Sequence, residues 1–267
     1  EADTEVGTRP MRTWIRLVPL LSLLVAASAA PANAQDRLCD PGNEVCRNIL
    51  LNYIANERVG IDVPFWFMED ARYTAALIRR HQAGVPVRVL IDTRANATYP
   101  LNASRLKELQ DAGIPMRRKV SSYILHWKMM LFEGQNVVQF SGANYSASAW
   151  RPGTSVPYES YIDEAIYFTS DTALVGSFRA QYDSHWVDTT NWTNYANVRS
   201  PLTRRYDILP KHWSLNFPPA ENFRTRSINS YRAERKAIDV IMYRITDRQH
   251  TDNIIATVNR GIPVRLI

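Results

Sequence analysis

The chain has 267 residues, of which 45% are hydrophobic and 22% are charged. A chain of this composition can bury a sizeable core, which excludes a chain too polar to fold and allows one large domain or two smaller ones. The formal net charge is +6, and residues 1–34 contain three acidic and three basic side chains, so the excess lies in the remainder. A mild basic balance suits an anionic partner, but it does not separate nucleic acid from anionic lipid.

The first local signal is a targeting segment. Arg12 and Arg16 precede an apolar run from Leu17 to Ala29, and Ala32-Asn33-Ala34 supplies the small residues that a signal peptidase accepts. The apolar run is too short for a transmembrane helix. We therefore expect a secretory signal peptide cleaved after about Ala34 and a secreted or periplasmic protein, in preference to a buried N-terminal helix. Residues 1–34 are left out of the fold prediction.

Two cysteines, Cys39 and Cys46, follow the expected cleavage site. Export to an oxidising compartment favours a disulfide between them, although two free thiols are the alternative. A zinc site needs more ligands than the neighbouring sequence offers, so no metal site is predicted.

The organising feature is an internal repeat at a separation of 177 residues. The segment that begins Ile61-Asp62-Val63 aligns without a gap over 30 positions with the segment that begins Ile238-Asp239-Val240, and ten positions are identical. A period this long indicates a duplicated domain and not a solenoid, whose repeats run to roughly 50 residues at most. Each copy has the pattern of a strand, a helix and a second strand, which is typical of parallel pairing in an α/β sheet.

In chain order the patterns predict an α/β fold with a duplicated mixed sheet flanked by helices. Strands are expected at residues 60–66, 85–91, 114–118, 125–132, 137–141 and 164–168, and helices at 73–83, from Ser104 to Ala112, and from Asp171 onward. The segment from Asp92 to Ser104 is predicted to be a loop. Residues 187–226 are predicted to be a linker or insertion, because prolines at 201, 210, 218 and 219 oppose regular structure. The first repeat then spans 35–186, and the second begins at 227 and runs to 267.

The residues that carry chemistry lie between Leu125 and Ser146. His126 and Lys128 are two positions apart, so on a strand both side chains project from the same face. Gly142 allows a close approach of backbone to a ligand, and Asn144 supplies an amide donor. An imidazole, an ammonium group, a glycine turn and an amide together suit an anionic tetrahedral group such as phosphate.

These residues resemble the signature of the phospholipase D superfamily, in which His-x-Lys is followed after four residues by an acid and then by a Gly-x-Asn turn. Glu133 stands where the family usually has Asp, and Glu164 resembles the downstream acid that orients the histidine. The resemblance covers essentially all of residues 49–267 and implies two such halves per active site, in agreement with the repeat.

The resemblance implies a mechanism without a metal ion or cofactor. His126 attacks the phosphorus and forms a phosphohistidine, while Lys128, Asn144 and the Gly142 turn bind the phosphate oxygens. Glu133 and Glu164 complete the expected catalytic set, and Glu133 is expected to support the geometry of the motif instead of touching substrate. A histidine from the other half protonates the leaving alcohol. The repeat places that histidine near position 303, so we expect the second catalytic half to be cut off and this chain alone to be inactive, unless two chains combine their sites.

The expected function is hydrolysis or transfer of the phosphodiester of a phospholipid, with peripheral contact to a membrane surface. The alternative within the same fold is an endonuclease or other nucleic-acid phosphodiesterase. A third hypothesis is a non-enzymatic binding protein on this fold. Two departures from the family pattern would permit it: Glu133 in place of Asp, and Ser141-Gly142 where the family usually has Gly-Ser or Gly-Gly.

Overall fold

The structure of the protein is a computed structural model that describes residues 36–267. Its largest element is an eight-stranded mixed sheet with the strand order β1-β7-β6-β5-β2-β3-β4-β8. The strands are β1 Arg37–Cys39, β2 Ile61–Phe65, β3 Val87–Ile91, β4 Met116–Lys119, β5 Met129–Phe132, β6 Val137–Ser141, β7 Ile166–Thr169 and β8 Trp192–Ala196. Strands β2, β3 and β4 are parallel to one another, and the remaining neighbours pair antiparallel. The expected mixed α/β sheet is therefore confirmed.

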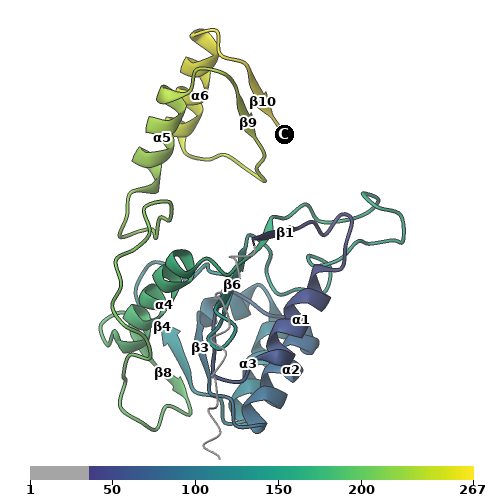
Figure 1. Cartoon of the computed structure of the whole chain (residues 1–267), viewed down its shortest axis with the longest axis vertical. Coiled ribbons are helices and arrows are strands. Elements are labelled where there is room, and N and C mark those ends of the chain that lie inside the picture. The colour runs from purple at the N-terminus through teal and green to yellow at the C-terminus, as the bar shows by residue number, and fades with distance from the viewer. Residues whose placement is uncertain (1–35) are drawn as a thin grey trace, which may run out of the picture. The chain divides into compact units, whose positions relative to one another are not determined.

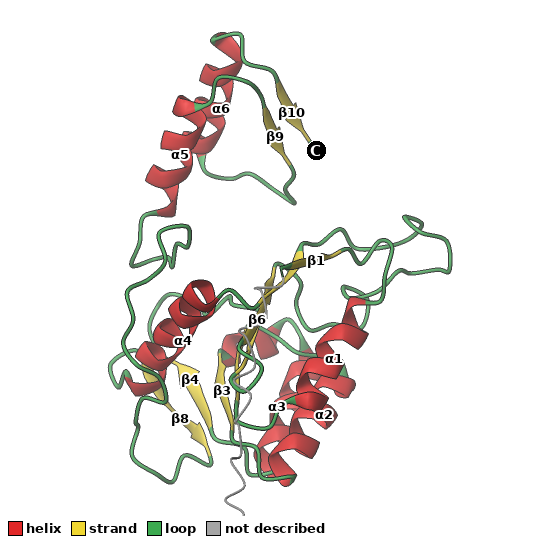
Figure 2. Ribbon diagram, in the orientation of Figure 1, coloured by secondary structure: helices red, strands yellow, loops and turns green. Residues whose placement is uncertain are grey.

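Helices cover both faces of this sheet (Figure 1). The helices α1 (Cys46–Asn56), α2 (Ala71–Gln82) and α3 (Pro100–Asp111) lie on one face, and α4 (Thr172–Val187) lies on the other (Figure 2). Side chains alternate along each strand, so Ile61, Val63 and Phe65 of β2 join the apolar cluster beneath α1–α3. A second cluster beneath α4 contains Leu131 of β5 and Phe178 of α4.

The second copy of the repeat folds as expected from the sequence. It contains α5 (Phe223–Ala233), β9 (Ile238–Val240), α6 (Arg248–Asn259) and β10 (Val264–Leu266), and β9 pairs parallel with β10. Helix α6 begins and ends 177 residues after α2, and α5 begins and ends 177 residues after α1. The structural repeat therefore includes a helix upstream of the aligned segment and begins at Phe223, four residues before the expected boundary at 227.

Two predictions of irregular structure were wrong. The segment after Asp92 forms a 3-10 turn (Thr93–Ala97) and then α3, which begins at Pro100 and not at Ser104. Proline has a fixed φ that suits the first helical position, and its missing N–H is not needed there. The expected linker contains β8, which pairs antiparallel with β4 at the edge of the sheet and ends before the first proline, at position 201.

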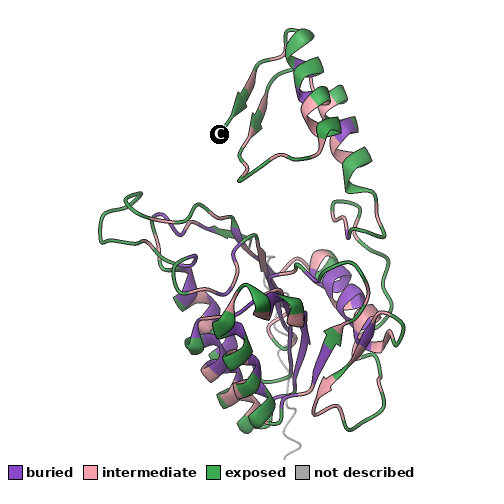
Figure 3. Ribbon diagram, turned by 180° about the vertical axis from the view of Figure 1, so that it is seen from behind, coloured by how far each residue is buried: buried purple, intermediate pink, exposed green. Residues whose placement is uncertain are grey.

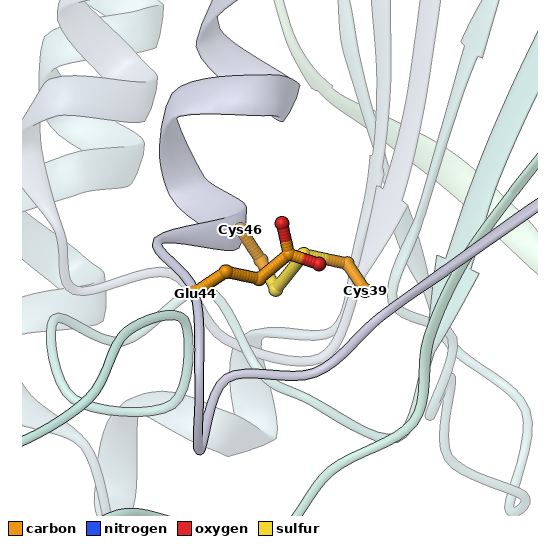
Figure 4. A group of neighbouring side chains, drawn as sticks. All are labelled: Cys39, Glu44 and Cys46. Carbon is orange, nitrogen blue, oxygen red and sulfur yellow. A yellow bond between two sulfur atoms is a disulfide. The ribbon is translucent and has the colours of Figure 1, made fainter. Parts of the chain in front are cut away.

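The disulfide between Cys39 and Cys46 is present, with Cα atoms 5.8 Å apart (Figure 4). It joins the end of β1 to the first residue of α1. The expected signal peptide lies outside the described residues. None of the helices in the described part of the chain is long and apolar enough to cross a membrane.

Candidate active site

His126 and Lys128 lie immediately before β5, next to the carboxyl end of the central strand β2. Lys128 forms an isolated antiparallel bridge with Phe65, the last residue of β2. The backbone N–H of Trp66 donates a hydrogen bond to the carbonyl of Trp127, with N and O 3.0 Å apart. The motif is thereby fixed at the carboxyl ends of the parallel strands, where ligand sites in open α/β sheets are generally found.

The two motif side chains contact each other, as the two-residue spacing predicts. Lys128 Nζ lies 2.8 Å from Nδ1 and 3.1 Å from Nε2 of His126. His126 is exposed, whereas Lys128 is buried with 3% of its surface exposed. Burial lowers the pKa of Lys128 to about 8, and the negative charge of Glu164 partly offsets this decrease. Burial and then the charge of Lys128 lower the pKa of His126 below its ordinary value, which favours the neutral imidazole that a nucleophile requires.

Glu164 and Gly142 lie next to each other beside this pair. A Cβ atom on residue 142 would stand 2.6 Å from Oε2 of Glu164, so the glycine makes room for the carboxylate. Burial raises the pKa of Glu164, and the charge of Lys128 partly offsets that rise. The structure thus brings together four of the expected site residues, His126, Lys128, Gly142 and Glu164.

Asn144 follows in the turn after β6. Its backbone carbonyl accepts a hydrogen bond from Nε1 of Trp150 at 2.8 Å, which fixes the turn. Its side-chain Oδ1 is buried, and no other residue in the described chain hydrogen-bonds it. A buried amide oxygen without a partner is uncommon in native proteins and often marks a functional site.

Glu133 lies apart from the other residues of the expected catalytic set, in a position that suits the supporting role expected for it. It follows the last residue of β5, and its backbone N–H binds the carbonyl of Gly60, at the opposite end of β2 from Phe65. Five residue steps along the strand separate it from Lys128, a distance of about 16 Å. Its carboxylate faces Arg205, with Oε2 and Nη1 3.7 Å apart. Glu133 can support the structure around the motif, but it cannot contact a group bound by His126.

Asp92 is a site residue that the sequence analysis missed. It follows β3 directly, is 1% exposed, and accepts a hydrogen bond from the backbone N–H of Leu125 at 3.0 Å. Asp92 therefore holds the segment that presents His126. Burial opposes its ionisation, but hydrogen bonds from Arg94 and Leu125 keep the pKa of this carboxyl below its ordinary value. An acid directly after a buried parallel strand was the available signal.

Two cavities adjoin His126. One of about 270 Å³ is mostly apolar and includes Met129, Phe140, Phe178 and Phe217 in its lining. The other, of about 510 Å³, is lined by aromatic, basic and aliphatic residues. His126 and Trp127 line both. The ring of Trp127 contacts His185 of the second cavity at 5.4 Å and Phe217 of the first at 5.8 Å, measured between ring centroids.

The described part of the chain offers few side-chain ligands for a metal ion. The one suitable group of His, Cys, Asp or Glu side chains there is Cys39, Glu44 and Cys46 (Figure 4). Both sulfur atoms are committed to the disulfide and so are not thiolate ligands.

The mixed α/β sheet and the paired His126 and Lys128 are what the phospholipase D resemblance implies, and comparison with known proteins gives the family. The family described as "Cardiolipin synthase, PLD-like domain" matches residues 50–186, half of the chain, so the protein belongs to this phospholipase D-like family. A curated relative, the mitochondrial cardiolipin hydrolase of Danio rerio, is 23% identical over 138 residues, which are 51% of this chain and 55% of that protein. The chain thus spans about half the length of this relative.

Solved structures show the same fold. Nuc from Salmonella typhimurium, a phospholipase D family member, aligns with a TM-score of 0.51 and 18% identity over 61% of this chain and 99% of that one. Phosphatidylserine synthase from Haemophilus influenzae aligns with a TM-score of 0.61 and 14% identity over 87% of this chain and 61% of that one. At these identities the likeness shows the fold alone.

Proposed function

We propose that this protein hydrolyses or transfers the phosphodiester of a phospholipid, with His126 as the nucleophile. The observation that carries the proposal is the contact between His126 and Lys128 beside Glu164. The neutral imidazole attacks phosphorus, a P–N bond forms, and the P–O bond to the leaving alcohol breaks. Lys128 stabilises the negative charge on the non-bridging oxygens, because a buried ammonium group interacts with an anion more strongly than one in water.

Two further steps complete the proposed reaction. A proton must reach the leaving alkoxide, and the repeat leads us to propose a histidine from a second catalytic half as its donor. Water or a second alcohol then attacks the phosphohistidine and regenerates the imidazole. Asn144, whose Oδ1 is buried and unpaired among the described residues, is proposed to turn its amide toward the phosphate.

The apolar cavity supports a lipid substrate. Its lining residues Met129, Phe140 and Phe178 lie beside His126, where they can bury part of an acyl chain or the glycerol backbone. The net charge of +6 is the observation that favours the second candidate, a nuclease, because phosphate backbones bind basic proteins. The disulfide supports export to an oxidising compartment, which we propose as the location of the protein.

The test is the His126→Ala variant of the full-length protein. We expect it to lose turnover of phosphatidylcholine in neutral mixed micelles by roughly 10³-fold or more, as is usual when a nucleophile is removed. His81→Ala, in α2 and outside the site, is the matched control and should keep the wild-type rate. Unchanged activity in His126→Ala would eliminate the nucleophile assignment. Salt-sensitive cleavage of DNA without lipid turnover would favour the nuclease.

A further inference from the structure

The second cavity beside His126 contains a lysine that the reaction proposed above does not use. Lys119 is the last residue of β4, and its cross-strand partner in β8 is Trp192. Both residues line the cavity of about 510 Å³, together with Tyr123, Trp127 and His185. Lys119 Nζ lies over the Trp192 ring, 4.9 Å from its centroid. The lysine is half-buried, and Trp192 is fully buried.

Lys119 has no anionic partner in the described part of the chain, where none of the ion pairs includes it. The acids that act on it electrostatically are Asp188 and Asp92, and both are otherwise engaged. Asp188 accepts hydrogen bonds from Thr190 and Asn191. Asp92 is paired with Arg94 at 2.6 Å.

A half-buried cation without a counter-ion is poorly solvated, and this favours the binding of an anion. Burial lowers the pKa of Lys119 below its ordinary value. The neighbouring His185 adds no charge near neutral pH, because burial and the charge of Lys119 lower its pKa to about 4. Lys119 therefore supplies the positive charge among the residues that line this cavity.

This charge decides between two kinds of ligand. An aromatic-walled cavity can bind a quaternary ammonium group through cation–π contacts. Here the face of Trp192 is already occupied by the ammonium group of Lys119, which would repel a second cation. A negatively charged group removes this conflict and gains a charge-assisted hydrogen bond.

We propose that Lys119 binds a second anionic group on the headgroup of the phospholipid, so that the enzyme prefers headgroups that carry a phosphate or carboxylate of their own. The inference rests on the proposed function, since it assumes that a lipid phosphodiester is held at His126. The apolar cavity takes the lipid side of the scissile phosphate and the Lys119 cavity takes the headgroup side, with Trp127 in contact with both. Lys119 is thus a specificity-determining residue.

Turnover of short-chain lipids tests this preference without a membrane surface. The full-length protein is assayed on monomeric dibutanoyl forms of phosphatidylcholine, phosphatidylserine and phosphatidylglycerol phosphate. Lys119→Met, which keeps most of the side-chain volume, is expected to lower kcat/KM for an anionic headgroup about tenfold and to leave phosphatidylcholine unchanged within about twofold. Loss only on the serine lipid identifies a carboxylate site, and loss only on the glycerol phosphate lipid identifies a phosphate site.

Two matched variants complete the design. Lys119→Arg restores the positive charge and should recover most of the lost kcat/KM. Lys107→Met removes an exposed lysine of α3 that is paired with Asp111, and should behave like the wild type on all three lipids. Equal effects of Lys119→Met on neutral and anionic lipids would overturn the proposal.

A binding measurement separates failure of this inference from failure of the proposed function. Glycerol 1,3-bisphosphate has two phosphates and no diester, so its affinity is measurable by calorimetry without turnover. We expect Lys119→Met to weaken its binding about tenfold and to leave glycerol 3-phosphate unchanged. Unchanged bisphosphate binding refutes the Lys119 site even if lipids are hydrolysed. A Lys119-dependent affinity without lipid turnover supports the site and refutes the phospholipase, while Lys119-dependent DNA cleavage refutes the headgroup assignment.

Discussion

The two copies of the repeat carry the same polar contacts in different surroundings. Asp62 pairs with Arg88 in the first copy, and Asp239 pairs with Arg265 in the second. The Asp62 side chain is 0% exposed and that of Arg88 9%, whereas the Asp239 and Arg265 side chains are 54% and 79% exposed. Figure 3 shows this contrast in the strands: the central strands β2, β3 and β5 of the large sheet are buried, whereas β9 and β10 are partly or fully exposed.

Other contacts repeat in the same way. Arg47 contacts Asp70, the N-cap of α2, and Arg224 contacts Asp247, the N-cap of α6. Glu57 and Glu234 each accept hydrogen bonds from the backbone N–H groups that follow them. The repeat therefore encodes the local geometry of each copy, and the elements that cover a copy determine how much each contact contributes to stability.

Asp62 is expected to show the largest difference between the copies. Its carboxylate binds Arg88, Arg205 and the hydroxyl of Tyr206, with donor–acceptor distances of 2.7 to 3.1 Å. Asp62→Ala leaves part of a buried cationic cluster uncompensated, at a cost of about 3 kcal/mol or more in the free energy of unfolding. Asp239→Ala removes an exposed pair and should leave the unfolding midpoint unchanged. Urea unfolding followed by circular dichroism measures both.

An equal loss of stability in Asp239→Ala and Asp62→Ala would contradict the conclusion that burial determines how much each pair contributes. Asp62→Asn provides a second variant in case the alanine protein does not fold. Asparagine keeps one acceptor oxygen for Arg88, so its loss of stability should be smaller than that of the alanine variant.

Glu57 gives the second test, of intermediate size. Its buried carboxylate accepts backbone N–H groups from two turns, those of Val59 at 2.7 Å and Gly134 at 2.9 Å among them. Glu57→Ala leaves several of these donors without an acceptor and should cost about 2 kcal/mol. Glu234→Ala affects only donors of its own turn, at a partly exposed position, and should unfold at the wild-type urea concentration. Indistinguishable midpoints for the two variants would show that burial is not the deciding variable.

The sequence predicted the parts of the fold that depend on local pattern. The β-branched run of β3 and the Asp171 cap of α4 are determined by residues within a few positions of each other, and both were recognised. Strand β8 was missed because it lies in a region rich in Asn, Thr and Pro, which indicated irregular structure, and it becomes a strand by pairing with β4 at the sheet edge. Such pairing depends on tertiary contact, which a local pattern does not report.

The candidate site likewise has residues that the sequence predicted and residues that only the structure shows. His126, Lys128, Gly142 and Glu164 were predicted from a motif, and the structure places them together. Glu133 was expected to support the motif without touching substrate, and the strand between them carries it to the opposite end of β5 from Lys128. Asp92 follows β3 and Lys119 is the last residue of β4. Neither belongs to the motif, so only the folded chain shows that they adjoin it.

The smallest expected effect tests whether burial also controls the charge of Lys128 within the site. Its pKa of about 8 predicts that kcat/KM falls as pH rises through about 8, because the neutral amine no longer stabilises the phosphate. The charge of Glu164 raises this pKa, so Glu164→Gln should move the alkaline limb of the pH profile to lower pH. Asp163→Asn, at an exposed neighbouring position, is the control and should leave the limb in place. An alkaline limb near the ordinary lysine value of 10.5 would mean that Lys128 behaves as an exposed amine, and the contrast between buried and exposed charge would then not extend to the site.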